Sequence, residues 1–315
     1  MKTVSTLRAL KQIRKPICMA AGFFDGLHRG HRALLLAAIS SARSNNGSAW
    51  IFTFAAHPLR TLSPAKAPLL LTSRDHKLKL LKSMGMDGCL MLNFSRRLAN
   101  LPPEKFIEQL CRNVPSLKCM IIGNNWRFGR GGAGSIALLR RTMAKKGISV
   151  IVVEPVRCGN EIISSTRIRE SVLNGRMEDA RMMLGRPFSI YGIVVRGKAI
   201  GRRIGFPTAN IDSHNEIRPP NGIYAVQADI GHRIIVNGVL SIGTRPTFSS
   251  DGKTTIELHI PGFHQNLYGR AIEIFFIRKI RDERKFQTVE QLTKQVARDI
   301  AIASMILKKE SEKIV

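Results

Sequence analysis

The first half of the chain alternates short apolar runs with longer segments in which apolar residues recur at helical spacing. We predict buried strands at residues 17–23, 50–54, 88–92, 119–122 and 149–153. We predict helices between them, at residues 31–43, 75–84, 103–112 and 134–146. Strands that alternate with helices are typical of parallel βαβ units, so we expect an α/β domain with a doubly wound parallel sheet.

The pattern changes after a helical stretch at about residues 165–184. Strand-like runs then follow one another without helices between them, at residues 189–196, 222–230, 232–242, 254–260 and 271–280. Gly, Pro and Asn separate these runs, which predicts a small antiparallel barrel, and helical spacing returns at residues 287–308. Because Gly185 and Pro187 end the preceding helix, we divide the chain into domains 1–184 and 185–315.

The composition is that of a globular protein from a reducing compartment. Hydrophobic residues make up 44% of the 315 residues, and no window approaches the roughly 20 apolar residues that a membrane-spanning helix needs. The five cysteines are odd in number and show no C-x-x-C spacing, which disfavours a disulfide framework or a structural zinc site. We therefore expect a cytoplasmic protein with buried free thiols and no membrane partner.

The formal net charge of +28 is unusually high, and the excess of Lys and Arg is heavier in the first domain. Such a field raises the local concentration of polyanions, whether nucleotides or nucleic acids. A general drift in amino-acid usage, with the charge solvated at the surface, accounts for it equally simply, and we favour drift. Aromatic residues make up only 6% of the chain and do not interleave with the basic ones, which disfavours a nucleic-acid partner.

The strongest chemical signal lies between the first predicted strand and the first predicted helix, where residues 22–31 spell G-F-F-D-G-L-H-R-G-H. Open α/β sheets bind ligands outside the carboxyl ends of their strands, and a helix N-terminus offers N–H donors to phosphate. His28 and His31 can donate to phosphoryl oxygens as charge develops, and Gly30 allows a close approach of the backbone. Taken alone, H-x-G-H is equally compatible with two surface histidines at a helix start.

This segment resembles the H-x-G-H nucleotidylyltransferases, and in particular the FAD synthetase module of bacterial bifunctional riboflavin kinase/FAD synthetases. Three further segments match that module in order: F-A-A-H-P at 54–58, G-N-N-W-R-F-G at 123–129 and I-S-S-T-R-I-R at 163–169. Alone, the last is a good helix cap, whose hydroxyls, N–H groups and arginines can also hold phosphates. The resemblance implies a nucleotide site formed by Gly22, Phe23, Asp25, His28, Gly30, His31, His57, Asn125, Ser164, Ser165, Thr166, Arg167 and Arg169.

The sequence departs from the family pattern through a loss of acidic residues. The family often has a carboxylate where Ala55 or Ala56 stands and an acidic residue where Asn124 stands, and Asn266 replaces the Asp of a D-L-Y-G turn. An alternative hypothesis is therefore that one half is impaired and the chain performs a single reaction. The adenylyl half would be the more affected, because more of the changes lie there.

A second signature follows the first predicted barrel strand, where residues 201–210 spell G-R-R-I-G-F-P-T-A-N and resemble the riboflavin kinase signature. Its glycines let the loop approach phosphates, and Thr208 and Asn210 supply neutral oxygen ligands suited to Mg²⁺. A proline fixes φ and stiffens the turn. The resemblance implies a binding loop that consists of Gly201, Arg202, Gly205, Phe206 and Pro207.

Later segments extend the resemblance to riboflavin kinases. They are I-G-T-R-P-T-F at 242–248, T-I-E-L-H at 255–259 and R-D-E-R-K-F at 281–286. On pattern alone, Glu257 is an outward-facing strand residue that balances a basic side chain. The resemblance makes it the general base that accepts a proton from the ribityl hydroxyl.

The resemblance covers the chain from about residue 15 to residue 308. It implies a bifunctional enzyme that phosphorylates riboflavin to FMN with ATP, and then adenylylates FMN to FAD with release of pyrophosphate. It implies Mg²⁺ as the cofactor of both steps, and riboflavin, FMN and ATP as the substrates. We expect a monomer or a weak oligomer.

Overall fold

The structure, a computed structural model, describes residues 1–197, 201, 204–231, 234–244 and 254–312. The chain forms two compact units, of which the first contains Met1–Leu69 and Arg74–Ser165 and the second contains Leu70–Ser73 and Thr166–Val315. The division falls nearer residue 165 than the predicted boundary after Leu184, because the helices that follow residue 165 pack with the barrel.

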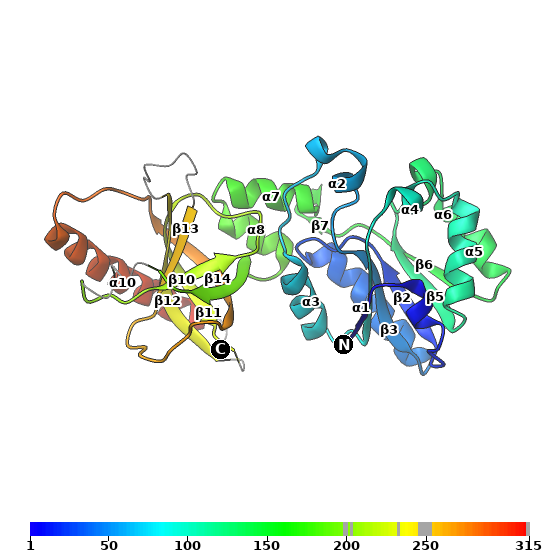
Figure 1. Cartoon of the computed structure of the whole chain (residues 1–315), viewed down its shortest axis with the longest axis horizontal. Helices are drawn as coiled ribbons and strands as arrows, with labels where there is room; N and C mark the ends of the chain where they lie inside the picture. Colours follow the sequence, from blue (N-terminus) through cyan, green and yellow to red (C-terminus); the bar gives the residue numbers. More distant parts are fainter. Residues whose placement is uncertain (198–200, 202–203, 232–233, 245–253, 313–315) are drawn as a thin grey trace. The chain divides into compact units, whose positions relative to one another are not determined.

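The first unit is built on a parallel sheet of six strands in the order β1-β4-β3-β2-β5-β6 (Figure 1). The strands are β1 (Lys2–Val4), β2 (Ile17–Ala21), β3 (Ser48–Phe54), β4 (Gly88–Leu92), β5 (Leu117–Gly123) and β6 (Ser149–Val153). The strand order reverses between β2 and β5, so the predicted doubly wound sheet is confirmed and its switch point lies at the carboxyl ends of these two strands. The edge strand β1 was not predicted, because three residues carry no periodic signal.

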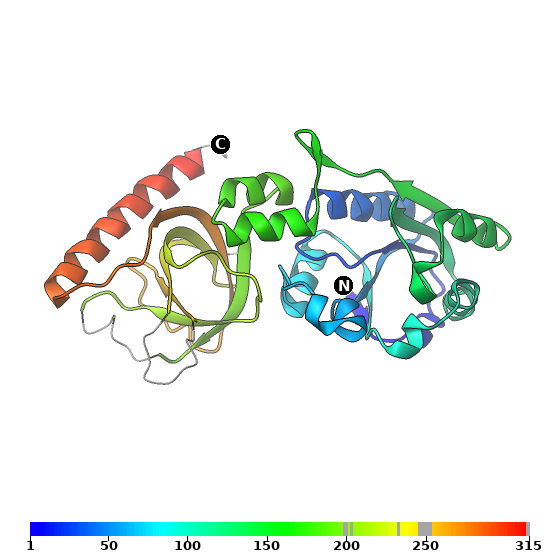
Figure 2. The ribbon, with the colours of Figure 1, turned by 90° about the horizontal axis from the view of Figure 1, so that it is seen from above.

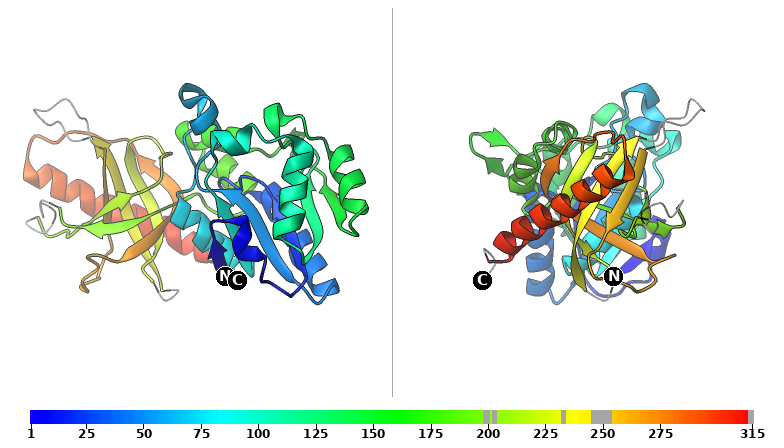
Figure 3. Two further views of the ribbon diagram at one scale, coloured as in Figure 1. Left: turned by 45° about the vertical axis from the view of Figure 1, so that its right-hand side comes forward. Right: turned by 90° about the vertical axis from the view of Figure 1, so that its left-hand side faces the viewer.

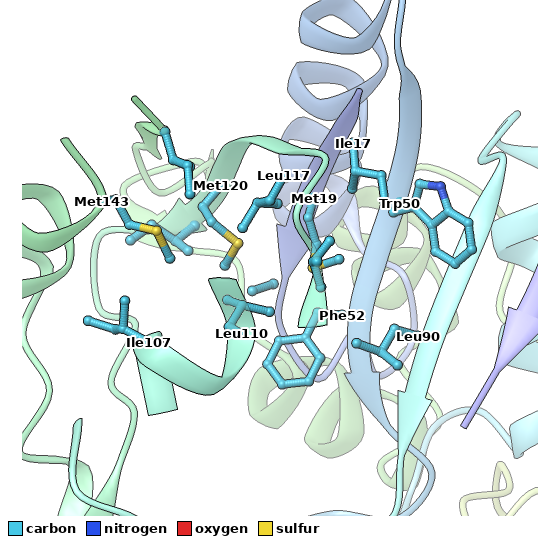
Figure 4. Close-up of a cluster of buried hydrophobic side chains, with 14 of the residues drawn as sticks. Ile17, Met19, Trp50, Phe52, Leu90, Ile107, Leu110, Leu117, Met120 and Met143 are labelled. Carbon is cyan, nitrogen blue, oxygen red and sulfur yellow. The ribbon is translucent and has the colours of Figure 1, made fainter. Parts of the chain in front are cut away.

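Helices cover both faces of this sheet. They are α1 (Arg29–Ser44) and α3 (Arg74–Ser83) on one face, and α5 (Pro103–Asn113) and α6 (Ile136–Ala144) on the other. Figure 4 shows the second face, where Ile107 and Leu110 of α5 and Met143 of α6 lie among strand side chains such as Met120. Because both faces are covered, the strands are continuous apolar runs and not alternating ones.

Short elements occupy the connections of the first unit. They are η1 (Leu7–Leu10), α2 (Leu59–Leu62), η2 (Pro64–Lys66), α4 (Arg96–Ala99), η3 (Arg130–Gly132) and the hairpin of β7 (Arg157–Cys158) and β8 (Glu161–Ile162). Among the cysteines, Cys18, Cys89 and Cys119 are buried in three strands of the sheet, and Cys111 and Cys158 are half-buried; all five are free thiols.

The second unit contains the predicted antiparallel barrel, which closes in the order β10-β13-β12-β11-β14-β9 (Figure 2). Its strands are β9 (Ser189–Val195), β10 (Ala209–Ser213), β11 (Gly222–Asp229), β12 (Ile235–Thr244), β13 (Thr254–His259) and β14 (Ala271–Arg281). The strand β10 was not predicted, because its first residues belong to the G-F-P-T-A-N motif that we interpreted as a loop.

Helices also flank the barrel. The helix predicted at 165–184 is two helices, α7 (Ser165–Leu173) and α8 (Met177–Leu184), because Gly175 between them adopts φ 71°. The terminal helix α10 (Val289–Glu312) lies across the outside of the barrel strands (Figure 3), and its Ala303 and Leu307 are buried against them. Within the described residues, no helix has the length and apolarity needed to cross a membrane.

A buried ion pair fastens α10 to the end of β14. The Arg281 guanidinium donates from Nε and Nη2 to the Asp299 carboxylate, at 3.0, 3.1 and 2.7 Å. Asp299 is 2% exposed and also accepts from Gln295 at 2.8 Å. Removing one member of such a pair leaves a buried charge without compensation, which destabilises a protein far more than the loss of an exposed pair does.

We therefore expect Asp299→Ala to lower the free energy of unfolding of the second unit by about 3 kcal/mol. Urea denaturation followed by far-ultraviolet circular dichroism would report this loss. Fluorescence would report the first unit separately, because Trp50 and Trp126 both lie there. Glu290→Ala, which removes an exposed pair with Lys294, is the control and should change stability by less than about 0.5 kcal/mol. Equal effects of the two substitutions would contradict the prediction.

Candidate active sites

The turn between β2 and α1 has an unusual backbone. Phe24 and Leu27 adopt φ values of 56° and 42°, in the left-handed region, where a non-glycine residue is strained by about 1–3 kcal/mol. Phe24 is fully buried, so its packing offsets part of this strain. The carbonyl of Phe23 just before it accepts hydrogen bonds from Thr53 Oγ1 at 3.0 Å and from Lys77 Nζ at 2.9 Å. The turn is thus fixed from two neighbouring elements.

The two histidines of the H-x-G-H motif lie together at the start of α1. His28 is its N-cap, and its Nδ1 accepts a hydrogen bond from the backbone N–H of His31 at 3.3 Å. The two imidazole rings stack with 3.6 Å between their centres, and Phe24 meets His31 edge-on. A Cβ on Gly30 would come within 3.2 Å of the His28 ring, so glycine keeps this arrangement free of a clash.

Burial keeps both imidazoles neutral at pH 7. It lowers the pKa of His28 to about 4, although the Asp25 carboxylate opposes the shift. Burial lowers the pKa of His31 well below its usual value, and repulsion by a protonated His28 and by the Lys77 ammonium lowers it further. Because Nδ1 of His28 accepts a hydrogen bond, its neutral ring carries the proton on Nε2, which can donate to a phosphoryl oxygen. The buried Nδ1 of His31 has no hydrogen-bond partner among the described residues.

Four other predicted site residues lie at the same edge of the sheet. Asp25 is buried in the turn, and its carbonyl accepts a hydrogen bond from Ser165 Oγ at 3.0 Å. His57 follows β3 and meets Phe23 edge-on at 4.8 Å between ring centres. Asn125 follows β5, and its side chain lies close to Gly123: a Cβ atom added to Gly123 would be 3.4 Å from Asn125 Oδ1. These positions gather around the switch point of the sheet.

The I-S-S-T-R-I-R segment is divided between the two units. Ser164 and Ser165 belong to the first unit, whereas Thr166, Arg167 and Arg169 belong to the second. The helix begins at Ser165, so Ser165 and Thr166 lie in its first turn and only Ser164 precedes it.

A cavity of about 420 Å³ opens beside the turn, and aromatic rings line much of it. We call it the aromatic cavity. Trp126 and Phe128 stack with 4.8 Å between ring centres, and Phe106 lies 5.5 Å from Phe128. Gly22 and Phe23 of the turn also border the cavity. A flat apolar ring system in this cavity would therefore lie against the turn that leads to the histidine pair.

Lys77 of α3 is a site residue that our sequence analysis missed. It is 2% exposed, and its ammonium group contacts the carbonyl and the ring of Phe23. Leu80 and Leu81, which are buried, follow it by three and four residues. This spacing places Lys77 on the apolar face of the helix, a signal that was present in the sequence.

In the second unit, the key side chains come from two paired strands. Asn210 at the start of β10 is the register partner of Glu257 on β13. Thr208, just before β10, donates from Oγ1 to Glu257 Oε2 at 3.2 Å. The neighbours Ile256 and Leu258 are buried, so alternation directs Glu257 toward the outer face of the barrel.

Two cavities meet at this point. The first, the α10 cavity, has a volume of about 320 Å³ and lies between the outer barrel face and α10, bordered by Phe206, Glu257 and Val296. The second, the Tyr268 cavity, also measures about 320 Å³ and is bordered by Pro207, Leu267 and Tyr268. Thr208 borders both cavities. A group transferred between ligands in the two cavities would pass beside Thr208 and Glu257.

The oxygen atoms at this junction suit a hard divalent cation. A hydroxyl, a carboxylate and an amide carbonyl converge in Thr208, Glu257 and Asn210. A Cβ on Gly201 would lie 3.2 Å from Thr208 Oγ1 and 2.3 Å from the carbonyl of Phe206, so the loop closes tightly here. Within the described part of the chain, no group of three His, Cys, Asp or Glu side chains forms a metal site of another kind.

The other kinase-motif residues are partly described. Gly205 has φ 87°, which requires glycine, and Phe206 and Pro207 border the cavities. Pro207 is held by His259, whose ring Nδ1 lies 2.8 Å from the Pro207 carbonyl. Arg202 and residues 245–248 of the I-G-T-R-P-T-F segment lie outside the described residues.

The fold and the two sites define a nucleotidylyl-transferring sheet unit joined to a kinase barrel. The family model described as FAD synthetase matches residues 10–167, and the model described as riboflavin kinase matches residues 184–307. Two relatives that are bifunctional riboflavin kinase/FMN adenylyltransferases are each 36% identical to this chain. The one from Buchnera aphidicola subsp. Schizaphis graminum matches over 96% of this chain and 97% of its own length. The one from Escherichia coli K12 matches over 95% of this chain and 96% of its own length. The chain therefore belongs to the bifunctional riboflavin kinase/FMN adenylyltransferase family.

A solved structure is similar over the same extent. A protein from Streptococcus pneumoniae, described as a macrolide-efflux protein, has a TM-score of 0.84 and 29% sequence identity. The match covers 96% of this chain and 99% of that one. The likeness thus includes both the sheet unit and the barrel.

Because both histidines are held neutral, we expect the free energy of unfolding of the first unit to fall in acid. The pKa of His28 is about 4 in the folded protein and near 6.5 when unfolded, so the unfolded state binds protons first and stability falls as pH drops from 6.5 toward 4. The loss is at most about 1.4 kcal/mol per pH unit for each histidine. Urea midpoints from tryptophan fluorescence at pH 7.5, 6 and 5 would measure it.

His28→Asn should flatten this pH dependence, because asparagine is a good N-cap that does not titrate. The matched control is His214→Asn, which changes an exposed histidine of the second unit. A midpoint that stays constant from pH 7.5 to pH 5 in the unmodified protein would show that the histidines are not held neutral.

Proposed function

We propose that this chain makes FAD from riboflavin in two ATP-dependent steps, with the kinase step on the barrel and the adenylyl step at the switch point of the sheet. The observation that carries the kinase assignment is the junction of the two barrel cavities at Thr208, within hydrogen-bond distance of Glu257. The observation that carries the adenylyl assignment is the stacked, neutral histidine pair at the start of α1.

In the kinase step, riboflavin would occupy the α10 cavity and ATP the Tyr268 cavity. Glu257 borders the α10 cavity and would accept the proton of the ribityl hydroxyl as its oxygen attacks the γ-phosphorus of ATP. Thr208 and Asn210 provide the neutral oxygen donors that would hold Mg²⁺, whose charge would offset that of the phosphates. Since phosphoryl transfer depends mainly on positioning, the fixed register of β10 and β13 supplies much of what the reaction needs.

In the adenylyl step, the phosphate of FMN attacks the α-phosphorus of ATP and pyrophosphate leaves. His28 and His31 would donate hydrogen bonds to the phosphoryl oxygens, on which negative charge develops. The N-terminus of α1 adds backbone N–H groups. The aromatic cavity would hold the isoalloxazine ring of FMN, because Trp126 and Phe128 already form a stack beside Phe23.

Asp25, Gly30, His57, Asn125 and Ser165 would shape the adenylyl site around these groups. We also propose that Ser164, Thr166, Arg167 and Arg169 bind the nucleotide phosphates, as the family resemblance implies. Although Asn124 is itself neutral, a carboxylate lies beside it, because Asn124 Nδ2 is 3.4 Å from Glu154 Oε2.

We assign residues 1–184 to adenylyl transfer and residues 185–315 to the kinase. The family models support this assignment outside residues 168–183, which neither model matches and which belong to the second compact unit. We further propose a cytoplasmic location, which the free thiols support, and a monomer or weak oligomer as the working form.

A substitution in the kinase site or in the adenylyl site should slow the reaction of that site only. We expect Glu257→Gln to lower the rate of riboflavin phosphorylation by roughly 10²–10⁴-fold, because it removes the general base. It should leave the conversion of FMN to FAD intact. We expect His31→Gln to lower FAD formation by about 10²–10³-fold and to leave FMN formation intact.

Chromatography of the flavin products, with riboflavin or FMN as the starting material and Mg²⁺ with ATP present, measures both reactions. Each variant is the control for the other. FMN made from riboflavin, with no FAD made from FMN by the unmodified protein, would instead identify a kinase with an impaired adenylyl half.

A further inference from the structure

Lys77 is a charged side chain enclosed in the core of the first unit. Its ammonium nitrogen lies 2.9 Å from the Phe23 carbonyl oxygen and 4.0 Å from the centre of the Phe23 ring, and the residue is 2% exposed. Lysine is almost never so fully buried, because removal from water disfavours the charged form. A position that only had to be filled would accept leucine or methionine.

The carbonyl that Lys77 contacts lies where the strand backbone ends and the left-handed turn begins. Phe24, the next residue, has a φ of 56°. Thr53 from β3 donates to the same carbonyl at 3.0 Å, so donors from two elements fix the orientation of this peptide group. The Phe24 ring then meets His31 edge-on, with 5.2 Å between ring centres. A continuous series of contacts thus joins Lys77 to the histidine pair.

Charged and titratable groups from three other elements act on Lys77. Asp25 of the turn and Cys89 of β4 favour its charged form, whereas His31 of α1 and the Lys77 ammonium oppose each other's protonation. Burial is the largest influence and lowers the pKa of Lys77 to about 8. The side chain is therefore mostly charged at pH 7 and loses its proton in the mildly alkaline range.

We propose that Lys77 is a positioning residue for adenylyl transfer, whose hydrogen bond to the Phe23 carbonyl holds the turn that presents His28 and His31. It acts through the backbone and not by contact with the substrates. The inference rests on the proposed adenylyl-transfer function of the same site. Its competitor is a purely structural role, in which Lys77 only fills the core beside Asp25.

The unmodified protein provides the first test. The kcat/KM for FAD formation from FMN and ATP should fall as pH rises through about 8, because neutral Lys77 is a weaker donor to Phe23. Riboflavin phosphorylation should not show this fall when it is measured at the same pH values in parallel assays that start from riboflavin, as the sum of FMN and FAD formed. FAD formation that stays constant from pH 7 to 9.5 would overturn the inference. A protein that makes no FAD at any pH would instead refute the proposed function.

Substitutions of Lys77 distinguish a positioning role from one in which the side chain only fills the core. Lys77→Met should lower kcat for FAD formation at pH 7.5 by about tenfold to a hundredfold, because a small displacement of the histidines suffices for such a loss. The KM for ATP should change little, and the alkaline decline should disappear. Lys77→Arg keeps the charge and should retain more of the kcat than Lys77→Met does.

Lys82→Met is the matched control, since Lys82 is an exposed lysine of the same helix, and it should leave both reactions unchanged. Two outcomes would overturn the inference. One is a Lys77→Met protein with the kcat and pH profile of the unmodified protein. The other is an equal loss of the kinase and adenylyl rates, which would indicate a general loss of folding.

Discussion

The adenylyl unit depends on one peptide group, that between Phe23 and Phe24. Its carbonyl accepts hydrogen bonds from Thr53 and Lys77, and beyond it the chain enters the left-handed region at a residue that is not glycine. Sterics disfavour this conformation, so it persists only because the surroundings of the turn determine it. Phe24 is directed into the core, and His28 is left as the N-cap of α1. The capping bond and the ring stack with His31 then define the orientation of both imidazoles.

The barrel positions its reacting groups by a different constraint, the register of antiparallel strands. Pairing of Asn210 with Glu257 places an amide side chain directly opposite a carboxylate. Thr208 joins them because it lies two residues before Asn210, on the same side of the strand. These side chains point out of the barrel, and α10 covers them; its attachment through Arg281 and Asp299 therefore shapes the α10 cavity as well as stabilising the unit.

Apart from Arg167 and Arg169, the groups that we propose to act on phosphate are not cationic side chains. In the sheet unit the donors are neutral imidazoles and the N–H groups of a helix start. In the barrel, the proposed groups are the hydroxyl of Thr208 and the amide of Asn210, whose oxygens suit a cation, and the Glu257 carboxylate beside them. The net charge of +28 is not needed to explain either arrangement, and the structure gives no other account of it. Lys77 differs from the surface lysines because its charge is directed inward, onto the backbone of the turn.

The sequence by itself determined the alternation of strands and helices in the first half, the antiparallel barrel, and the motifs that carry His28, His31, Thr208, Asn210 and Glu257. These are local properties, since periodicity and turn residues act over a few neighbours. Only the tertiary structure decided that Phe24 is left-handed, that Lys77 reaches Phe23 across 54 positions of sequence, and that aromatic rings from residues 23–128 line one cavity. Such features depend on contacts between segments far apart in the chain, which a local pattern does not encode. The outward direction of Glu257 was already indicated by the alternation of β13, but only the tertiary structure decided that α10 covers this face and leaves a cavity there.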